Sequence, residues 1–151
     1  MNLQTTTALA ALAIQLLLTG SANAESVKLP KFVRIKSQHT QKYMRTDSDK
    51  WIYADASSEG AIIFETIRDG GNYYFKVKGT GVYLSYRDST GAVKLYDSGD
   101  DASYEIKGGS TMTIRNVYHD QYMWVDGKAP YITGAGAGKG DEKRWIFEEV
   151  K

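Results

Sequence analysis

The chain has no cysteine, only two prolines among its 151 residues, two histidines and a formal net charge of +1. The absence of cysteine excludes disulfides, a thiol nucleophile and a cysteine zinc cluster, so a hydrophobic core must hold the fold. Because 19 basic residues are balanced by 18 acidic ones, we expect no broad positive field for nucleic acid. No nucleophile elbow or phosphate-binding loop is present. We therefore expect neither catalysis nor a cofactor.

Long apolar runs are also scarce, apart from one near the start of the chain. Ala8 to Leu18 is apolar except at Gln15, and the small residues Ala22-Asn23-Ala24 follow. A bilayer span needs about 20 apolar residues, so this run is too short for membrane insertion. The pattern predicts a secretory signal peptide over residues 1–24 and a secreted domain over residues 25–151.

What the chain does contain is a repeat. A tyrosine followed by methionine or leucine occurs at Tyr43, Tyr83 and Tyr122, which are 40 and 39 residues apart (43 to 83 to 122). Each copy follows an alternating β-type run and precedes a turn, a second β-rich run and an aromatic-acidic closing run. A fixed period of about 40 residues indicates a repeat architecture. The predicted units cover about residues 32–70, 72–108 and 110–151.

Four short strands in each unit make twelve strands, and we expect an all-β fold. Turn signals come about every 8 to 12 residues, which is typical of a sandwich or a barrel. Threefold recurrence favours the barrel, because three equivalent units can close around a pseudo-threefold axis with six strands in the barrel and six in hairpins. Closure also removes exposed sheet edges.

These patterns resemble the β-trefoil superfamily over residues 32–150. Lys42-Tyr43-Met44 and Val82-Tyr83-Leu84-Ser85 are similar to the Gly-Lys-Tyr-Leu-Ser pattern of fascin-type trefoils, and Trp145-Ile146-Phe147 lies where ricin-type lectins carry Gln-x-Trp-x-Phe. The chain departs from the ricin type in having Lys143 at the glutamine position and no paired cysteines. The resemblance implies a β-trefoil of twelve short strands, and it does not carry over the ricin-type sugar site.

Binding through loops is the predicted function, with carbohydrate as the leading ligand. A sugar site needs an exposed aromatic face for C–H groups and a carboxylate or amide for hydroxyls. Three loop clusters combine these groups at roughly equivalent positions, which would allow up to three related sites. The same carboxylates are also typical of hairpin turns, so a structural role is the alternative. The candidate ligand-binding residues are Asp47, Asp49 and Trp51 in the first unit, Tyr86 and Asp88 in the second, and His119, Asp120, Trp124 and Asp126 in the third.

Other aromatic and histidine residues have a structural interpretation. We expect Trp145, aligned with Ile62 and Ala102 of the other units, to lie in the core, and the three repeated tyrosines to form a structural ring. His39 and His119 lie in corresponding loops before Tyr43 and Tyr122. We expect them to be solvated histidines and not metal ligands, because three or four converging ligands are not visible.

Two rival functions remain open. The first is a protein-binding trefoil, such as a protease inhibitor or a secreted effector, for which Gly134 to Gly140 would be the protruding loop. The second is a structural protein of a cell surface or matrix. The expected partner is thus a glycan or an extracellular protein, with no nucleic acid and no membrane insertion, bound by a monomer. Fold alone does not separate these functions.

Overall fold

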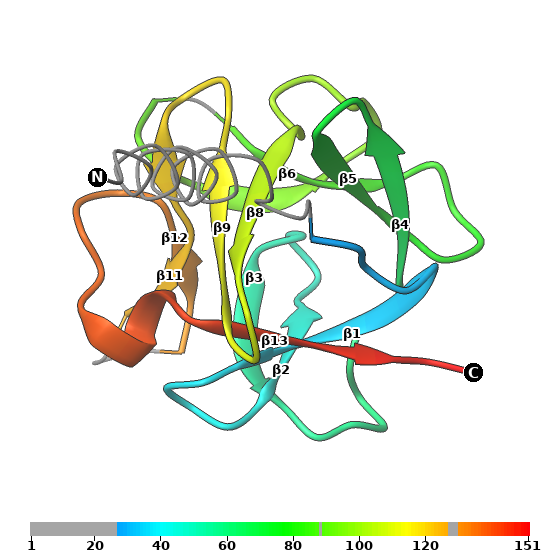
Figure 1. The fold of residues 1–151 in the computed structure, drawn as a ribbon, viewed down its shortest axis with the longest axis horizontal. Helices are drawn as coiled ribbons and strands as arrows, with labels where there is room; N and C mark the ends of the chain where they lie inside the picture. The colour runs from blue at the N-terminus through cyan, green and yellow to red at the C-terminus, as the bar shows by residue number, and fades with distance from the viewer. Residues whose placement is uncertain (1–26, 88, 127–129) are drawn as a thin grey trace, which may run out of the picture.

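The computed structural model describes residues 27–87, 89–126 and 130–151, and the predicted signal peptide lies outside them. This part of the chain forms thirteen β-strands and one short 3-10 helix (Figure 1). Among the described residues, no helix has the length and apolar character needed to cross a membrane. The strands are β1 (Phe32–Ser37), β2 (Tyr43–Thr46), β3 (Ile52–Ala56), β4 (Phe64–Asp69), β5 (Asn72–Val77), β6 (Tyr83–Tyr86), β7 (Val93–Tyr96), β8 (Tyr104–Gly108), β9 (Met112–Asn116), β10 (Gln121–Tyr122), β11 (Trp124–Val125), β12 (Ile132–Thr133) and β13 (Trp145–Glu149), and the helix η1 (Gly140–Lys143) precedes β13.

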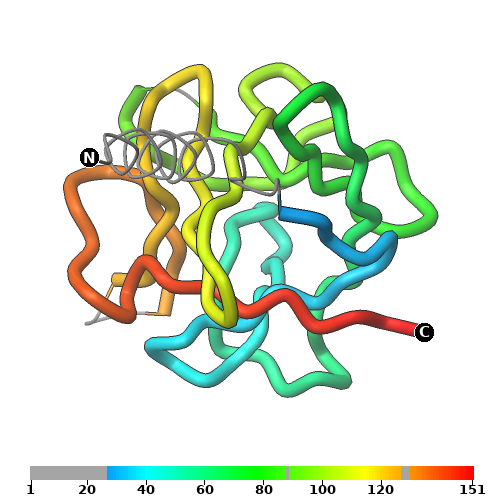
Figure 2. The backbone as a smooth tube through the Cα atoms, viewed as in Figure 1, coloured from blue at the N-terminus to red at the C-terminus, as the bar shows by residue number. Residues whose placement is uncertain are grey.

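Six of the strands close into a barrel. They pair in the cycle β1, β4, β5, β8, β9 and β13, and every pairing is antiparallel. Figure 2 shows the first and last strands, in blue and red, running side by side. In this pairing Ile35 lies opposite Phe147. Each unit contributes its first and its last strand to the cycle. The predicted closed barrel is therefore confirmed.

The remaining strands form three hairpins, in which β2 pairs with β3, β6 with β7 and β11 with β12. Isolated bridges link the hairpins in a cycle, and each bridge joins the same two positions of successive units. Backbone hydrogen bonds next to the bridges repeat the cycle. The bridges are Trp51 to Lys94, Ala92 to Thr133 and Tyr131 to Tyr53; the hydrogen bonds run from Leu95 N to Lys50 O, from Gly134 N to Gly91 O and from Ala54 N to Pro130 O. The three units are thus related by a pseudo-threefold axis.

The core is assembled from equivalent residues of the three units. The alternating burial of β1 shows how a period-two pattern turns every second side chain inward. Trp145 is fully buried as predicted, and its indole N–H donates to the Met123 carbonyl oxygen at 3.0 Å. Four sets of three side chains, each at most 2% exposed, fill the interior: Ile35, Phe75 and Ile114; Met44, Leu84 and Met123; Ile52, Val93 and Ile132; and Phe64, Tyr104 and Trp145.

Two details of the predicted repeat differ. The closing strand of the third unit is shifted by two residues, since Trp145 lies opposite Ser37 as Phe64 lies opposite Val77. Trp145 is therefore equivalent to Phe64 and Tyr104, and its alignment with Ile62 and Ala102 was wrong. The core needs a large side chain at this point. The identical tripeptides Ile63-Phe64-Glu65 and Ile146-Phe147-Glu148 suggested a different alignment of the two closing strands. The thirteenth strand arises because pairing is interrupted at Met123, between β10 and β11.

The three repeated tyrosines, expected to form a structural ring, are not buried, since Tyr43 and Tyr83 are half-buried and Tyr122 is exposed. Each lies opposite a basic residue of the preceding strand, as Tyr43 does with Lys36 and Tyr122 with Arg115. Tyr122 is 41% exposed, whereas the next residue, Met123, is fully buried. The buried ring is thus made by the methionine or leucine that follows each tyrosine.

Candidate functional site

In the first unit, the predicted site residues shape a turn. The carboxylate of Asp47 accepts hydrogen bonds from the backbone N–H of Asp49 at 3.0 Å and of Trp51 at 2.9 Å, and from the hydroxyl of Tyr53 at 3.1 Å. This last hydrogen bond raises the pKa of Tyr53. The Nζ of Lys94 lies 4.6 Å from the centre of the Trp51 ring. The structural role therefore accounts for Asp47, and one face of Trp51 is occupied by a lysine of the neighbouring hairpin.

In the third-unit hairpin, the predicted site residues Asp126 and Trp124 likewise make contacts within the protein. Asp126 accepts a hydrogen bond from the Tyr131 hydroxyl at 3.0 Å, which raises the pKa of Tyr131. The Trp124 indole donates to the Ala135 carbonyl oxygen at 3.0 Å. A Cβ at Gly138 would lie 2.5 Å from the Cβ of Trp124, so the backbone is pressed against this side chain. The segment following β12 thus covers part of Trp124.

Tyr86, expected on an exposed loop, is only 2% exposed. Its ring fills the space beside Gly134, where any Cβ would collide with it. Burial strongly raises the pKa of Tyr86. The exposed placement expected for this residue was wrong, because the missing side chain at Gly134 lets a large ring turn inward. Its predicted neighbour Asp88 lies outside the described residues.

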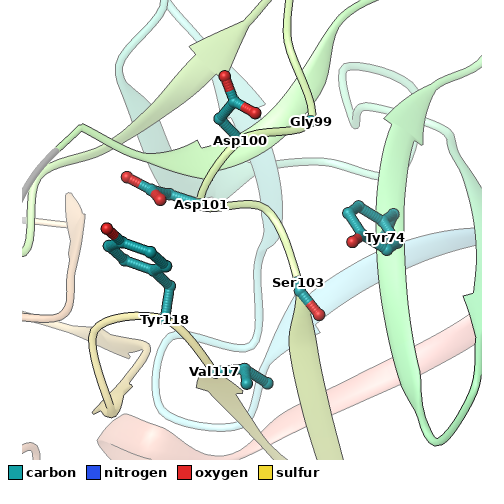
Figure 3. A pocket seen from close by; sticks show the side chains of 7 residues that line it. All are labelled: Tyr74, Gly99, Asp100, Asp101, Ser103, Val117 and Tyr118. Atoms are coloured by element: carbon teal, nitrogen blue, oxygen red, sulfur yellow. The ribbon is translucent and has the colours of Figure 1, made fainter.

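An open cleft of about 550 Å³ lies elsewhere, beside β5 and between two loops that follow β7 and β9. Tyr118, which is 75% exposed, stands on one side, and Figure 3 shows Tyr74 across the cleft from it, with Ser103 between them. Asp100 and Asp101 lie on the segment that leads to Ser103, with the Asp101 carboxylate beside the Tyr118 ring and the Asp100 carboxylate directed away from Ser103 (Figure 3). The cleft thus combines two aromatic rings with a hydroxyl, and an acidic pair lies at its edge. Its lining residues are Tyr74, Gly99, Asp100, Asp101, Ser103, Val117 and Tyr118.

Asp101 is held by contacts to both its carboxylate and its backbone. The Oδ2 of Asp101 lies 3.1 Å from the Nε2 of His119, and the Asn116 side-chain amide donates to the backbone carbonyl oxygen of Asp101 at 2.6 Å. Asn116 also accepts from the His119 backbone N–H at 2.9 Å. The His119 ring in turn stacks on buried Tyr86, with centroids 6.0 Å apart and planes 14° from parallel. Two predicted site residues, Tyr86 and His119, therefore meet here as supports of the cleft.

The loop carrying Tyr118 is also held at its far end. Arg115 donates to the carboxylate of Asp120 at 2.6 Å and to that of Glu105 at 3.0 Å. The ion pair lowers the pKa of Glu105. Backbone hydrogen bonding from Val117 N to Ser103 O, at 2.9 Å, joins this loop to the opposite one. These hydrogen bonds hold the two loops that line the cleft in a defined geometry.

Sequence reasoning missed the tyrosines of the cleft because it searched within single hairpin turns. The backbone bond from Val117 to Ser103 recurs from Lys78 to Ile63 and from Gln38 to Arg144, which fixes the equivalent positions. Tyr118 then corresponds to Gly79 and His39, and Tyr74 corresponds to Arg34 and Thr113. The sequence suggested that His39 and His119 are equivalent, but His39 corresponds to Tyr118 and not to His119. The sequence signal that could have indicated the cleft is a tyrosine, such as Tyr118 or Tyr74, at a position where the other two units carry no aromatic ring of this kind.

The acidic residues of the cleft recur in another unit, whereas its tyrosines do not. Asp100 and Asp101 correspond to Asp141 and Glu142 in the third unit, so an acidic pair occurs twice. Within residues 27–87, 89–126 and 130–151, no three histidine or acidic side chains are grouped so that they could hold a metal ion. The pairing of two tyrosines with the acidic residues is what distinguishes the cleft.

The barrel of three equivalent units with its hairpins defines the β-trefoil fold, and comparison with solved structures shows the same. The chain is similar to the designed threefold-symmetric protein ThreeFoil, with a TM-score of 0.68 and 14% identity over 80% of this chain and 99% of that one. It is also similar to the BEL β-trefoil, with a TM-score of 0.66 and 17% identity over 84% and 98%. An endo-β-galactosidase from Clostridium perfringens that releases GlcNAcα1-4Gal matches with a TM-score of 0.67 and 14% identity over 80% of this chain and 32% of the enzyme.

One curated protein is similar in sequence. Hemolysin-1 of Aeromonas salmonicida is 27% identical over 127 residues, covering 79% of this chain and 22% of the hemolysin. This chain therefore spans about a fifth of the length of that relative. No family model matches the chain.

Proposed function

We propose that the protein is a secreted, non-catalytic carbohydrate-binding β-trefoil whose ligand occupies the cleft between Tyr74 and Tyr118. The observation that carries the proposal is the exposed ring of Tyr118 beside the fixed carboxylate of Asp101. A sugar offers C–H groups that pack on an aromatic face and hydroxyls that donate to a carboxylate. An open cleft of about 550 Å³ lies within the size range of small-ligand sites.

The comparisons are consistent with a module that serves a larger glycan-directed protein. In the C. perfringens enzyme, the similar region is about a third of a chain that acts on a glycan. In the Aeromonas hemolysin, it is about a fifth of the whole. We infer that this chain acts by binding.

The rival role as a protein-binding inhibitor has less support. It requires the 134–140 segment to present a protruding loop, yet Gly134 and Gly138 are buried against Tyr86 and Trp124. Trp124 also donates to the carbonyl oxygen of Ala135. The segment is therefore packed on the molecule at Gly134 and Gly138, which leaves only short exposed stretches between and after them.

Glycan-array binding of the purified protein tests the proposal. The array is repeated with Tyr118→Ala in the cleft and with Tyr131→Ala, a matched control for an exposed tyrosine on the hairpins. We expect Tyr118→Ala to weaken binding about tenfold or more, since a central aromatic contact contributes at least 1–2 kcal/mol, and Tyr131→Ala to leave it unchanged. A loss confined to Tyr131→Ala would move the site to the hairpins. A protein that binds no glycan would favour a protein ligand.

A further inference from the structure

A second hollow adjoins the cleft. It has a volume of about 390 Å³ and lies on the β4–β5 hairpin and the start of β6. Its lining includes the half-buried ring of Tyr83 and the exposed residues Arg68 and Asp69. Like the cleft, it therefore places an aromatic ring next to charged groups.

The two hollows meet at a common boundary. Tyr74 and Gly99 line both of them. A Cβ built at Gly99 would lie 3.8 Å from two ring carbons of Tyr74, which is an ordinary contact distance. The backbone at position 99 therefore lies beside the Tyr74 ring without a side chain rising between the hollows. The two hollows thus adjoin at Tyr74 and Gly99, and we refer to them together as the groove.

We propose that the ligand is a linear oligosaccharide whose sugar units lie on both sides of Tyr74, one against Tyr118 and Asp101 and another against Tyr83. This proposal rests on the carbohydrate-binding function proposed above. The groove holds an aromatic ring at each end and one in the middle, which suits successive sugar rings of a chain. A single sugar unit would fill only one hollow and would leave the contacts of the other unused.

Substitution at the far end of the groove separates this proposal from a single-pocket site. Tyr83→Ala removes a contact of the second hollow alone, so we expect it to weaken oligosaccharide binding about tenfold and to leave monosaccharide binding unchanged. Because Tyr83 also pairs with Tyr96 in the β6–β7 hairpin, a second variant is needed. Gly99→Gln places a side chain at the boundary without removing any group from either hollow, and the same selective loss is expected.

The probes are chito-, cello- and N-acetyllactosamine tetrasaccharides, each titrated calorimetrically beside its own monosaccharide. Gly81→Gln is the matched control, since an added Cβ there meets nothing within 4 Å and the residue lines neither hollow. The extended groove would be overturned if Tyr83→Ala and Gly99→Gln weakened tetrasaccharide and monosaccharide binding equally, or if neither variant weakened binding. Either result would leave the proposed carbohydrate-binding function standing. Failure of the unmodified protein to bind any saccharide, here and on the array, would instead overturn the proposed function.

Discussion

The hairpin region and the groove use the same threefold repeat in opposite ways. In the hairpins, the bridge from Trp51 to Lys94 has a counterpart between every pair of units. In the groove, Tyr118 and Tyr74 stand at positions where the other units carry His39, Gly79, Arg34 and Thr113. Repetition therefore builds the scaffold, and departure from it creates a particular surface.

The polar groups of the two regions differ accordingly. Asp47 and Asp126 are engaged in turns and by tyrosine hydroxyls. Asp101 also has a partner, His119, but its carboxylate lies beside the exposed ring of Tyr118. Carboxylates of similar sequence context thus have different roles because of where their partners lie.

The largest expected effect comes from breaking the repeated core. Trp145→Ala removes a fully buried indole and its hydrogen bond to Met123. We expect the free energy of unfolding to fall by about 3–5 kcal/mol, because the cavity cannot collapse in a barrel closed on all sides. Urea denaturation measures the change. A loss below about 1 kcal/mol would show that this residue is not part of the shared core.

A smaller effect is expected where the glycine segment packs on the third hairpin. Gly138→Ala places a methyl group 2.5 Å from the Cβ of Trp124, so the backbone must shift. We expect a loss of about 1–3 kcal/mol in thermal or urea unfolding, which is typical of overpacking. Gly81→Ala, with nothing within 4 Å of the added methyl, serves as the control and is expected to be near neutral. Equal stability of the two variants would contradict the packing of this segment.

The ion pairs that support the groove predict a pH dependence. Arg115 lowers the pKa of Glu105 in the folded protein, so the pair stabilises the fold above the ordinary carboxyl pKa, and the benefit disappears as pH falls through the lowered value. We expect Glu105→Gln to cost about 0.5–1 kcal/mol at neutral pH. Stability curves of the two proteins should converge in acid. Curves that stay parallel down to low pH would show that the pair contributes nothing.

The smallest effect on stability is expected at the exposed ring of the groove. Tyr118 is 75% exposed, so Tyr118→Ala should change the free energy of unfolding by no more than about 0.5 kcal/mol. Chemical denaturation compares it with the unmodified protein. A large loss would mean that the ring supports the fold and would weaken the contrast between scaffold and groove.

The sequence predicted the scaffold well because its signals are local and repeated. The alternation in β1 indicates a half-buried strand. The tyrosine pairs at 43, 83 and 122 indicate that the same order of strands occurs three times. The groove could not be predicted as easily, since Tyr74, Asp101 and Tyr118 come from separate segments and two units. Tyr86 was misplaced for a similar reason, because its burial depends on the space left by Gly134, 48 positions further along the chain (86 to 134).

The most direct test of the account is amide chemical-shift mapping by NMR, with the isotope-labelled protein titrated with an N-acetyllactosamine tetrasaccharide or another glycan that binds on the array. We expect perturbations over residues 67–69, 97–103 and 117–120 and at Tyr74 and Tyr83, and none at the equivalent loop of residues 38–41. Perturbations centred on Trp51 and Trp124, or repeated equally in all three units, would contradict it.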